Sequence, residues 1–145
     1  MTAARPRTLL AFDFGLKRIG VAVGQTRTES ANPLDTVAVK QERPDWSAIA
    51  RLIEAWAPDS LVVGLPLNMD GSEQEMTHRA RRFGRQLQGR FALPVHLVDE
   101  RLSTCEAKSR LALAGRGGED ADATAAQIIL EDWFSLNSRA EDLRP

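Results

Sequence analysis

Short apolar segments that suit β-strands alternate along the chain with longer segments that have helical spacing. The first two, Thr8–Phe14 and residues 19–24, predict a β-hairpin, because apolar residues in the second alternate with glycine and alanine. A third strand is expected at residues 36–40. The continuous apolar run Ser60–Leu65 is typical of a central strand that is covered on both faces. Residues 94–98 predict the fifth strand.

Helical periodicity marks four other segments. The first predicted helix begins after Pro44, and the second begins with Ser72 and Glu75, which have the spacing of a capping box. Two more helices are expected at residues 103–115 and 121–134. This order of strands and helices predicts an α/β fold, with a mixed five-stranded sheet flanked by helices.

The aromatic and histidine positions suggest packing rather than chemistry. Trp46, Trp56 and Trp133 fall on the apolar stripes of the predicted helices, so we expect them in the core and not on a base-stacking surface. His78 and His96 have no partner at a spacing that suggests a metal site.

The length of the chain favours one folded domain. Its 145 residues suffice to bury about two thirds of the unfolded surface, and we expect a domain at residues 1–137 followed by a tail at residues 138–145. The single cysteine, Cys105, cannot form an internal disulfide, which favours a reducing cytoplasm. No window approaches the roughly 20 apolar residues of a membrane span, so we expect a soluble protein without a membrane partner.

The net charge of −1 hides an uneven distribution of charge. Residues 76–118 contain nine Lys or Arg against three Asp or Glu, whereas residues 119–145 contain two against seven. The basic middle section suits a surface for an anionic ligand, and ordinary solvated helix faces explain it equally well.

Three acidic residues stand at positions where sheets commonly place their ligands. Asp13 ends the first strand, Glu100 directly follows the fifth, and Asp122 shares the apolar stripe of the last helix with Ile129. Each has an ordinary explanation: a turn residue, a salt bridge with Arg101, and a helix N-cap, respectively. Three carboxylates gathered at one place would nevertheless repel each other, by about 4 kcal/mol per pair at about 4 Å and an effective dielectric of about 20.

Divalent cations would offset this repulsion, because carboxylates and water are the ligands that Mg²⁺ and Mn²⁺ prefer. Two such ions roughly 4 Å apart promote phosphodiester hydrolysis. We therefore predict that Asp13 bridges two ions and that Glu100 and Asp122 complete their ligands. Basic and hydroxyl side chains would hold the nucleic-acid backbone; the candidates are Lys17, Arg18, Arg79, Arg81, Arg82, Arg85, Arg101, Ser103, Thr104 and Lys108. Ser103 suits a helix cap as well, and Lys17 and Arg18 suit surface charges of the hairpin.

Four motifs follow one another along the chain. They are LAFDFG at 10–15 with IGVA at 19–22, VGLPLNMDG at 63–71, DERLST at 99–104, and DATAAQIIL at 122–130. With them the chain resembles the YqgF (RuvX) family of bacterial RNase H-like proteins over nearly its whole length. The resemblance implies an RNase H-like fold and places Asp13, Glu100 and Asp122 in the acidic metal-binding positions.

The same resemblance implies a nuclease that matures the 5′ end of the 16S ribosomal RNA precursor during ribosome biogenesis. Older assignments in the family are to Holliday-junction resolution, and members have been linked to transcription. Related sequences usually have a longer, basic loop before the last acid, whereas residues 114–121 are short and acidic, which predicts a weaker substrate grip there.

Two other functions compete with the nuclease. The Asp13-Phe14-Gly15 segment also resembles the first phosphate hairpin of sugar kinases and actin-like ATPases, but 145 residues supply only one of the two lobes of such proteins. The other alternative is a non-catalytic nucleic-acid-binding or transcription factor. The sequence leaves open whether the substrate is RNA or branched DNA, whether the protein associates with the ribosome, and whether it is a monomer or a weak homodimer.

Overall fold

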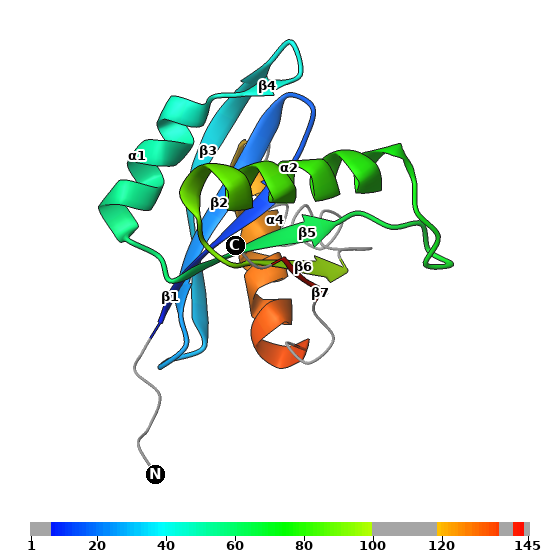
Figure 1. Ribbon diagram of the computed structural model, residues 1–145. Coiled ribbons are helices and arrows are strands. Elements are labelled where there is room, and N and C mark those ends of the chain that lie inside the picture. Colours follow the sequence, from blue (N-terminus) through cyan, green and yellow to red (C-terminus); the bar gives the residue numbers. More distant parts are fainter. Residues whose placement is uncertain (1–6, 100–118, 137–140, 144–145) are drawn as a thin grey trace.

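The computed structural model describes residues 7–99, 119–136 and 141–143 (Figure 1). Within them, seven strands form one sheet in the order β4-β3-β2-β1-β5-β6-β7. The strands are β1 (Thr8–Phe14), β2 (Arg18–Gln25), β3 (Ser30–Lys40), β4 (Arg43–Pro44), β5 (Ser60–Leu65), β6 (Val95–Asp99) and β7 (Glu141–Leu143). The helices are α1 (Trp46–Trp56), α2 (Glu75–Phe91) and α4 (Glu119–Leu136). None of these helices is long and apolar enough to cross a membrane.

The pairing of the strands makes the sheet mixed. β1, β2 and β3 are antiparallel neighbours, whereas β1, β5 and β6 run parallel. The carboxyl ends of β1, β5 and β6 therefore lie along one edge of the molecule. The predicted α/β fold is confirmed: the five expected strands are present, and the short edge strands β4 and β7 extend the sheet. Strands of two or three residues carry too little alternation to be predicted.

One of these edge strands comes from the segment expected to be a tail. Glu141–Leu143 pairs antiparallel with β6, so that Leu143 lies opposite Val95. The backbone groups of this segment thus complete the sheet edge. The division of the chain into one domain and a tail stays a prediction.

Alternation along β1 divides the core into two clusters. Leu10 and Phe12 pack with Phe83 of α2, whereas Leu9 and Ala11 pack with Ile129 of α4. Figure 1 shows the same division, with α1 and α2 on one side of the sheet and α4 on the other. Both faces of β1 and β5 are covered, which explains why their sequences are almost continuously apolar.

The start of α2 differs from the prediction. Its capping box is formed by Gln74 and Thr77, whose hydroxyl accepts a hydrogen bond from the Gln74 backbone N–H at 3.0 Å. The predicted pair, Ser72 and Glu75, is wrong because the Ser72 hydroxyl donates to Asp70 at 2.6 Å and so belongs to the preceding turn.

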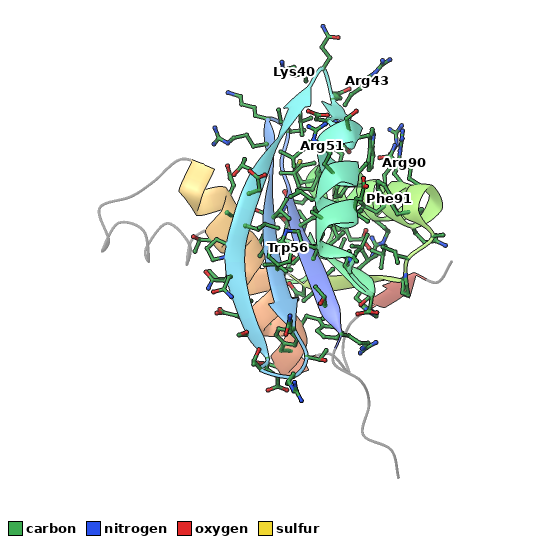
Figure 2. All side chains as sticks on the ribbon, turned by 90° about the vertical axis from the view of Figure 1, so that its left-hand side faces the viewer. Lys40, Arg43, Arg51, Trp56, Arg90 and Phe91 are labelled. Carbon is green, nitrogen blue, oxygen red and sulfur yellow. The ribbon has the colours of Figure 1, made fainter. Side chains whose placement is uncertain are left out.

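Two of the three tryptophans lie in the core, as predicted. Trp133 is 5% exposed, and Trp46 packs against the α2 side of the sheet. The prediction for Trp56 is wrong, because this side chain is 41% exposed. Trp56 shares the helical phase of Ile49, but it is the last residue of α1 and lies at the end of the helix (Figure 2).

The backbone of α4 lies very close to the sheet at Gly20. A Cβ atom at this position would lie 1.8 Å from the backbone carbonyl oxygen of Asp122. Only glycine, which has no side chain, allows the helix backbone to rest directly on β2. The packing of α4 therefore depends on the absence of one methyl group.

Replacing Gly20 with alanine should lower the free energy of unfolding by about 3 kcal/mol or more, because the new methyl group would meet backbone rather than a movable side chain. Urea denaturation would measure the change. The matched control is Gly89→Ala in α2, where an added Cβ meets nothing within 4 Å. This control should stabilise the protein by about 0.5–1 kcal/mol, because alanine favours helix. Equal stability of the two variants would contradict the tight packing of α4.

Candidate functional site

Asp13 and Asp122 both lie next to Gly20, at the edge where β1 ends. Asp13 has the same parity along β1 as Leu9 and Ala11, so its side chain is on the α4 face of the sheet. Gly20 lies directly opposite Asp13 in the β1–β2 ladder. Because the backbone of Asp122 rests on that glycine, the two half-buried acids come to the same side of the same strand end.

Arg18, the first residue of β2, supplies a positive charge to this site. Its Nε donates a hydrogen bond to Oδ2 of Asp122 at 2.6 Å. The pair is partly open to solvent, since the two side chains are 42% and 26% exposed. Arg18, predicted to bind nucleic acid, is therefore held at Asp122, while Lys17 is exposed in the turn before it.

The third predicted acid, Glu100, lies outside the described residues, as do Arg101, Ser103, Thr104 and Lys108. Its neighbours in the sequence nevertheless show how β6 approaches the edge. Val98 packs on the α4 side of the sheet, whereas Asp99 lines a hollow with Leu97 and Arg81 on the α2 side. Asp99 therefore does not share the face of Asp13.

The arginines of α2 are not gathered with the acids, because α2 covers the opposite face of the sheet. They also divide between two sides of the helix. Arg79 and Arg82 point toward β3 and β4, where Arg79 donates to Glu42 at 2.8 Å. Arg81 donates to Glu73 at 2.8 Å on the other side, and Arg85 is exposed. The role of these four side chains in nucleic-acid binding stays a prediction.

Two features of this site had no clear signal in the sequence. The first is the contact of Gly20 with Asp122, although the small residues of β2 already indicated room for a close neighbour. The second is the ion pair between Arg18 and Asp122, which joins residues 104 positions apart. No local spacing predicts such a pair.

The donor chemistry of the site suits a hard divalent cation. Asp13 and Asp122 offer carboxylate oxygens at one strand end, and oxygen ligands are those that Mg²⁺ and Mn²⁺ prefer. In the described part of the chain, no cluster of three or more His, Cys, Asp or Glu side chains could hold a metal ion. A ligand set made of these two acids and Glu100 stays a prediction.

Comparison with known proteins finds relatives over nearly the whole chain. A family model described as RuvX, Holliday junction resolvase, matches residues 7–136. A relative from Nitrosococcus oceani is 53% identical over 91% of this chain and 89% of its own length. One from Azotobacter vinelandii is 52% identical, with 90% and 94% covered. Both relatives carry the provisional name of pre-16S rRNA nuclease.

Among solved structures, the fold is similar to RuvC of Thermus thermophilus in complex with a Holliday junction substrate. The TM-score is 0.54, the sequence identity is 16%, and the similarity covers 94% of this chain and 99% of that one. At this identity the similarity concerns the fold alone, and it identifies the fold as RNase H-like.

The ion pair between Arg18 and Asp122 should contribute about 1 kcal/mol or less to stability, because water screens a partly exposed pair. A double-mutant cycle of Arg18→Gln, Asp122→Asn and the combined variant, followed by urea denaturation, would measure the coupling energy. A coupling of about 3 kcal/mol or more, as found when a buried pair is broken, would show that the two residues serve the fold instead of the site.

Proposed function

Because the chain belongs to the RuvX family, we propose that it is a nuclease that hydrolyses phosphodiester bonds and that it processes the 5′ end of precursor 16S ribosomal RNA. The observation that carries this proposal is that Gly20 lies opposite Asp13 and in contact with the backbone of Asp122. This supports a site at the carboxyl ends of the parallel strands β1, β5 and β6, where α/β folds commonly bind their ligands. The names of the relatives support the choice of substrate.

Asp13, Glu100 and Asp122 would hold two Mg²⁺ or Mn²⁺ ions. When bound, these ions supply positive charge that favours attack by water and departure of the leaving oxygen. This role is supported by the position of Asp13 at the end of β1 and by the contact of the Asp122 backbone with Gly20, which lies opposite Asp13. Because Arg18 already lies at Asp122, its guanidinium would donate to a phosphate oxygen of the substrate there.

Resolution of Holliday junctions is the second candidate function. It is supported by the description of the family model and by a fold similar to RuvC. Cleavage of a four-way junction requires two coordinated sites and hence a dimer, whereas maturation of an RNA end can be done by a monomer. A cytoplasmic protein that associates with ribosome precursors would suit the first function.

The variant Asp13→Asn should lose cleavage of a precursor RNA by about 100-fold or more. Loss of residues that merely support metal ligands already costs about 10- to 100-fold, and a ligand should cost at least as much. Cleavage would be followed in Mg²⁺ on an RNA that carries the 5′ extension and, in parallel, on a four-way DNA junction. Addition of EDTA should abolish the wild-type activity.

The control for this test is Glu54→Gln, which removes one exposed carboxylate from α1. It should cleave like the wild type. Equal cleavage by the wild type and by Asp13→Asn would overturn the assignment of the site. Cleavage of the four-way DNA junction but not of the RNA would favour the second function.

A further inference from the structure

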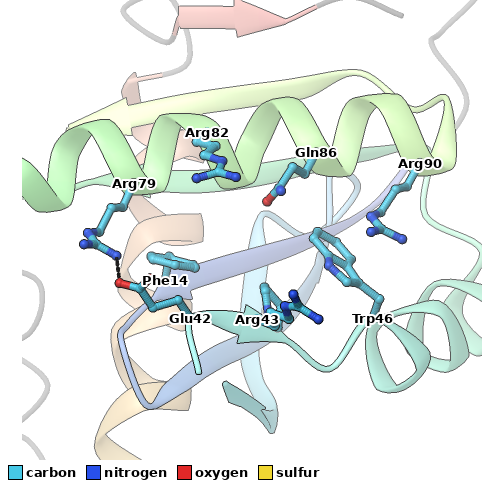
Figure 3. A pocket seen from close by; sticks show the side chains of 9 residues that line it. Phe14, Glu42, Arg43, Trp46, Arg79, Arg82, Gln86 and Arg90 are labelled. Carbon is cyan, nitrogen blue, oxygen red and sulfur yellow. Dashed lines mark hydrogen bonds and ion pairs between the residues drawn. The ribbon is translucent and has the colours of Figure 1, made fainter. Parts of the chain in front are cut away.

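A basic pocket lies on the face of the sheet opposite the acids. It has a volume of about 480 Å³ and lies between α2, the start of α1 and the β3–β4 turn (Figure 3). Its lining residues are Phe14, Glu42, Arg43, Pro44, Trp46, Arg79, Arg82, Gln86 and Arg90. Four of the nine are arginines and one is acidic, so the lining carries a net charge of +3.

The one acid of the lining is already engaged. Arg79 donates to Glu42 at 2.8 Å, and this hydrogen bond holds the pKa of Glu42 below its usual value. Glu42 and the preceding Gln41 both have left-handed backbone conformations, with φ of 63° and 52°, which non-glycine residues adopt at a cost. The turn that carries this wall of the pocket is thus held in an unusual conformation with Glu42 directed to Arg79.

The other three arginines have no such partner: within residues 7–99, 119–136 and 141–143, no ion pair joins Arg43, Arg82 or Arg90 to a carboxylate. Figure 3 shows Arg82 reaching into the pocket from α2, with Arg43 on the opposite wall. Guanidinium groups that converge on a concave surface raise its positive potential and attract anions.

Arg90 is held in place by an aromatic side chain instead of an acid. Its guanidinium lies 4.2 Å from the centre of the Trp46 ring. Trp46 in turn stacks on Phe83, with ring centres 5.6 Å apart and an angle of 25° between the planes. This packing orients Arg90 and leaves its N–H groups for a ligand. It also covers the Trp46 ring, so the pocket suits phosphates better than stacked bases.

We propose that this pocket binds consecutive phosphate groups of the nucleic-acid strand on which the enzyme acts. The pocket follows α2 from Arg79 to Arg90, eleven helical steps of about 1.5 Å each, or about 16 Å. This length exceeds what a single phosphate group needs, so it suits more than one phosphate of the same nucleic-acid strand. Phe14 lines the pocket and directly follows Asp13 in β1. A nucleic-acid strand that passes over this end of the sheet would therefore reach both the pocket and the acidic site on the other face. The choice of ligand rests on the proposed function.

The test is the salt dependence of binding by the double variant Arg43→Gln/Arg82→Gln. Binding of a single-stranded RNA would be measured by fluorescence anisotropy in EDTA, so that no cleavage occurs, between about 50 and 300 mM KCl. Each lost phosphate contact on a single strand lowers the slope of log K against log salt by about 0.7. We expect the slope to fall by about 1.4 and the Kd to rise about tenfold at low salt.

The matched control is Arg27→Gln/Arg51→Gln, which removes the same charge from two exposed positions outside the pocket (Arg51 is shown in Figure 2). Its slope should equal that of the wild type. Arg43→Lys/Arg82→Lys, which keeps the charge, should restore most of the slope. Because both pocket residues are exposed, we expect the same Tm for all variants. Equal slopes for the Arg43→Gln/Arg82→Gln variant and its control would overturn the proposal.

A second arm distinguishes a nucleic-acid strand from a small phosphorylated molecule. Calorimetry would measure the binding of inorganic pyrophosphate to the wild type and to the Arg43→Gln/Arg82→Gln variant. Loss of pyrophosphate binding with unchanged RNA affinity would overturn the assignment to a strand. Since these measurements need no cleavage, a pocket that binds RNA in a protein that cleaves nothing would refute the proposed nuclease and leave the pocket standing.

Discussion

The contact between the backbone of α4 and Gly20 is the constraint on which the rest of the structure depends. It sets the distance between the last helix and the sheet, and it does so directly across from Asp13. Gly24 continues the same line, because a Cβ there would lie 2.5 Å from the Ser30 carbonyl oxygen and 2.7 Å from a methyl group of Leu130. The packing that completes one half of the core therefore also brings Asp122 to the candidate site.

The sheet separates two kinds of charge. The acids lie on the face covered by α4, and the arginines of α2 lie on the face covered by α1 and α2. Arg18 is the cation that the structure shows at Asp122, and it comes from β2 and not from α2. Adjacent residues of β1 point to opposite faces, and Asp13 and Phe14 thereby connect the acidic site with the basic pocket. One face of the sheet can thus serve cleavage, while the other face binds the nucleic-acid strand.

The accuracy of the sequence predictions depended on how local each signal was. The strands of the first hairpin and the central strand follow from alternation and apolar runs, and α1 begins next to Asp45, whose side chain accepts from the Ala48 N–H at 3.1 Å. The cap of α2 was misassigned because the hydroxyl of Ser72 is taken by Asp70. Trp56 was misplaced because helical phase gives a direction and does not reveal where the core ends.

The sequence by itself determined the α/β order of elements and the family, because these depend on periodicity and on motifs within short segments. Only the tertiary structure decided that Gly20 joins the two acids and that Arg18 pairs with Asp122. It alone separated Arg79 and Arg82 from Arg81, and brought Arg43 and Arg90 to one pocket. The reason is physical: such contacts depend on how strands and helices distant in the chain are packed, and spacing along a sequence carries no information about that distance.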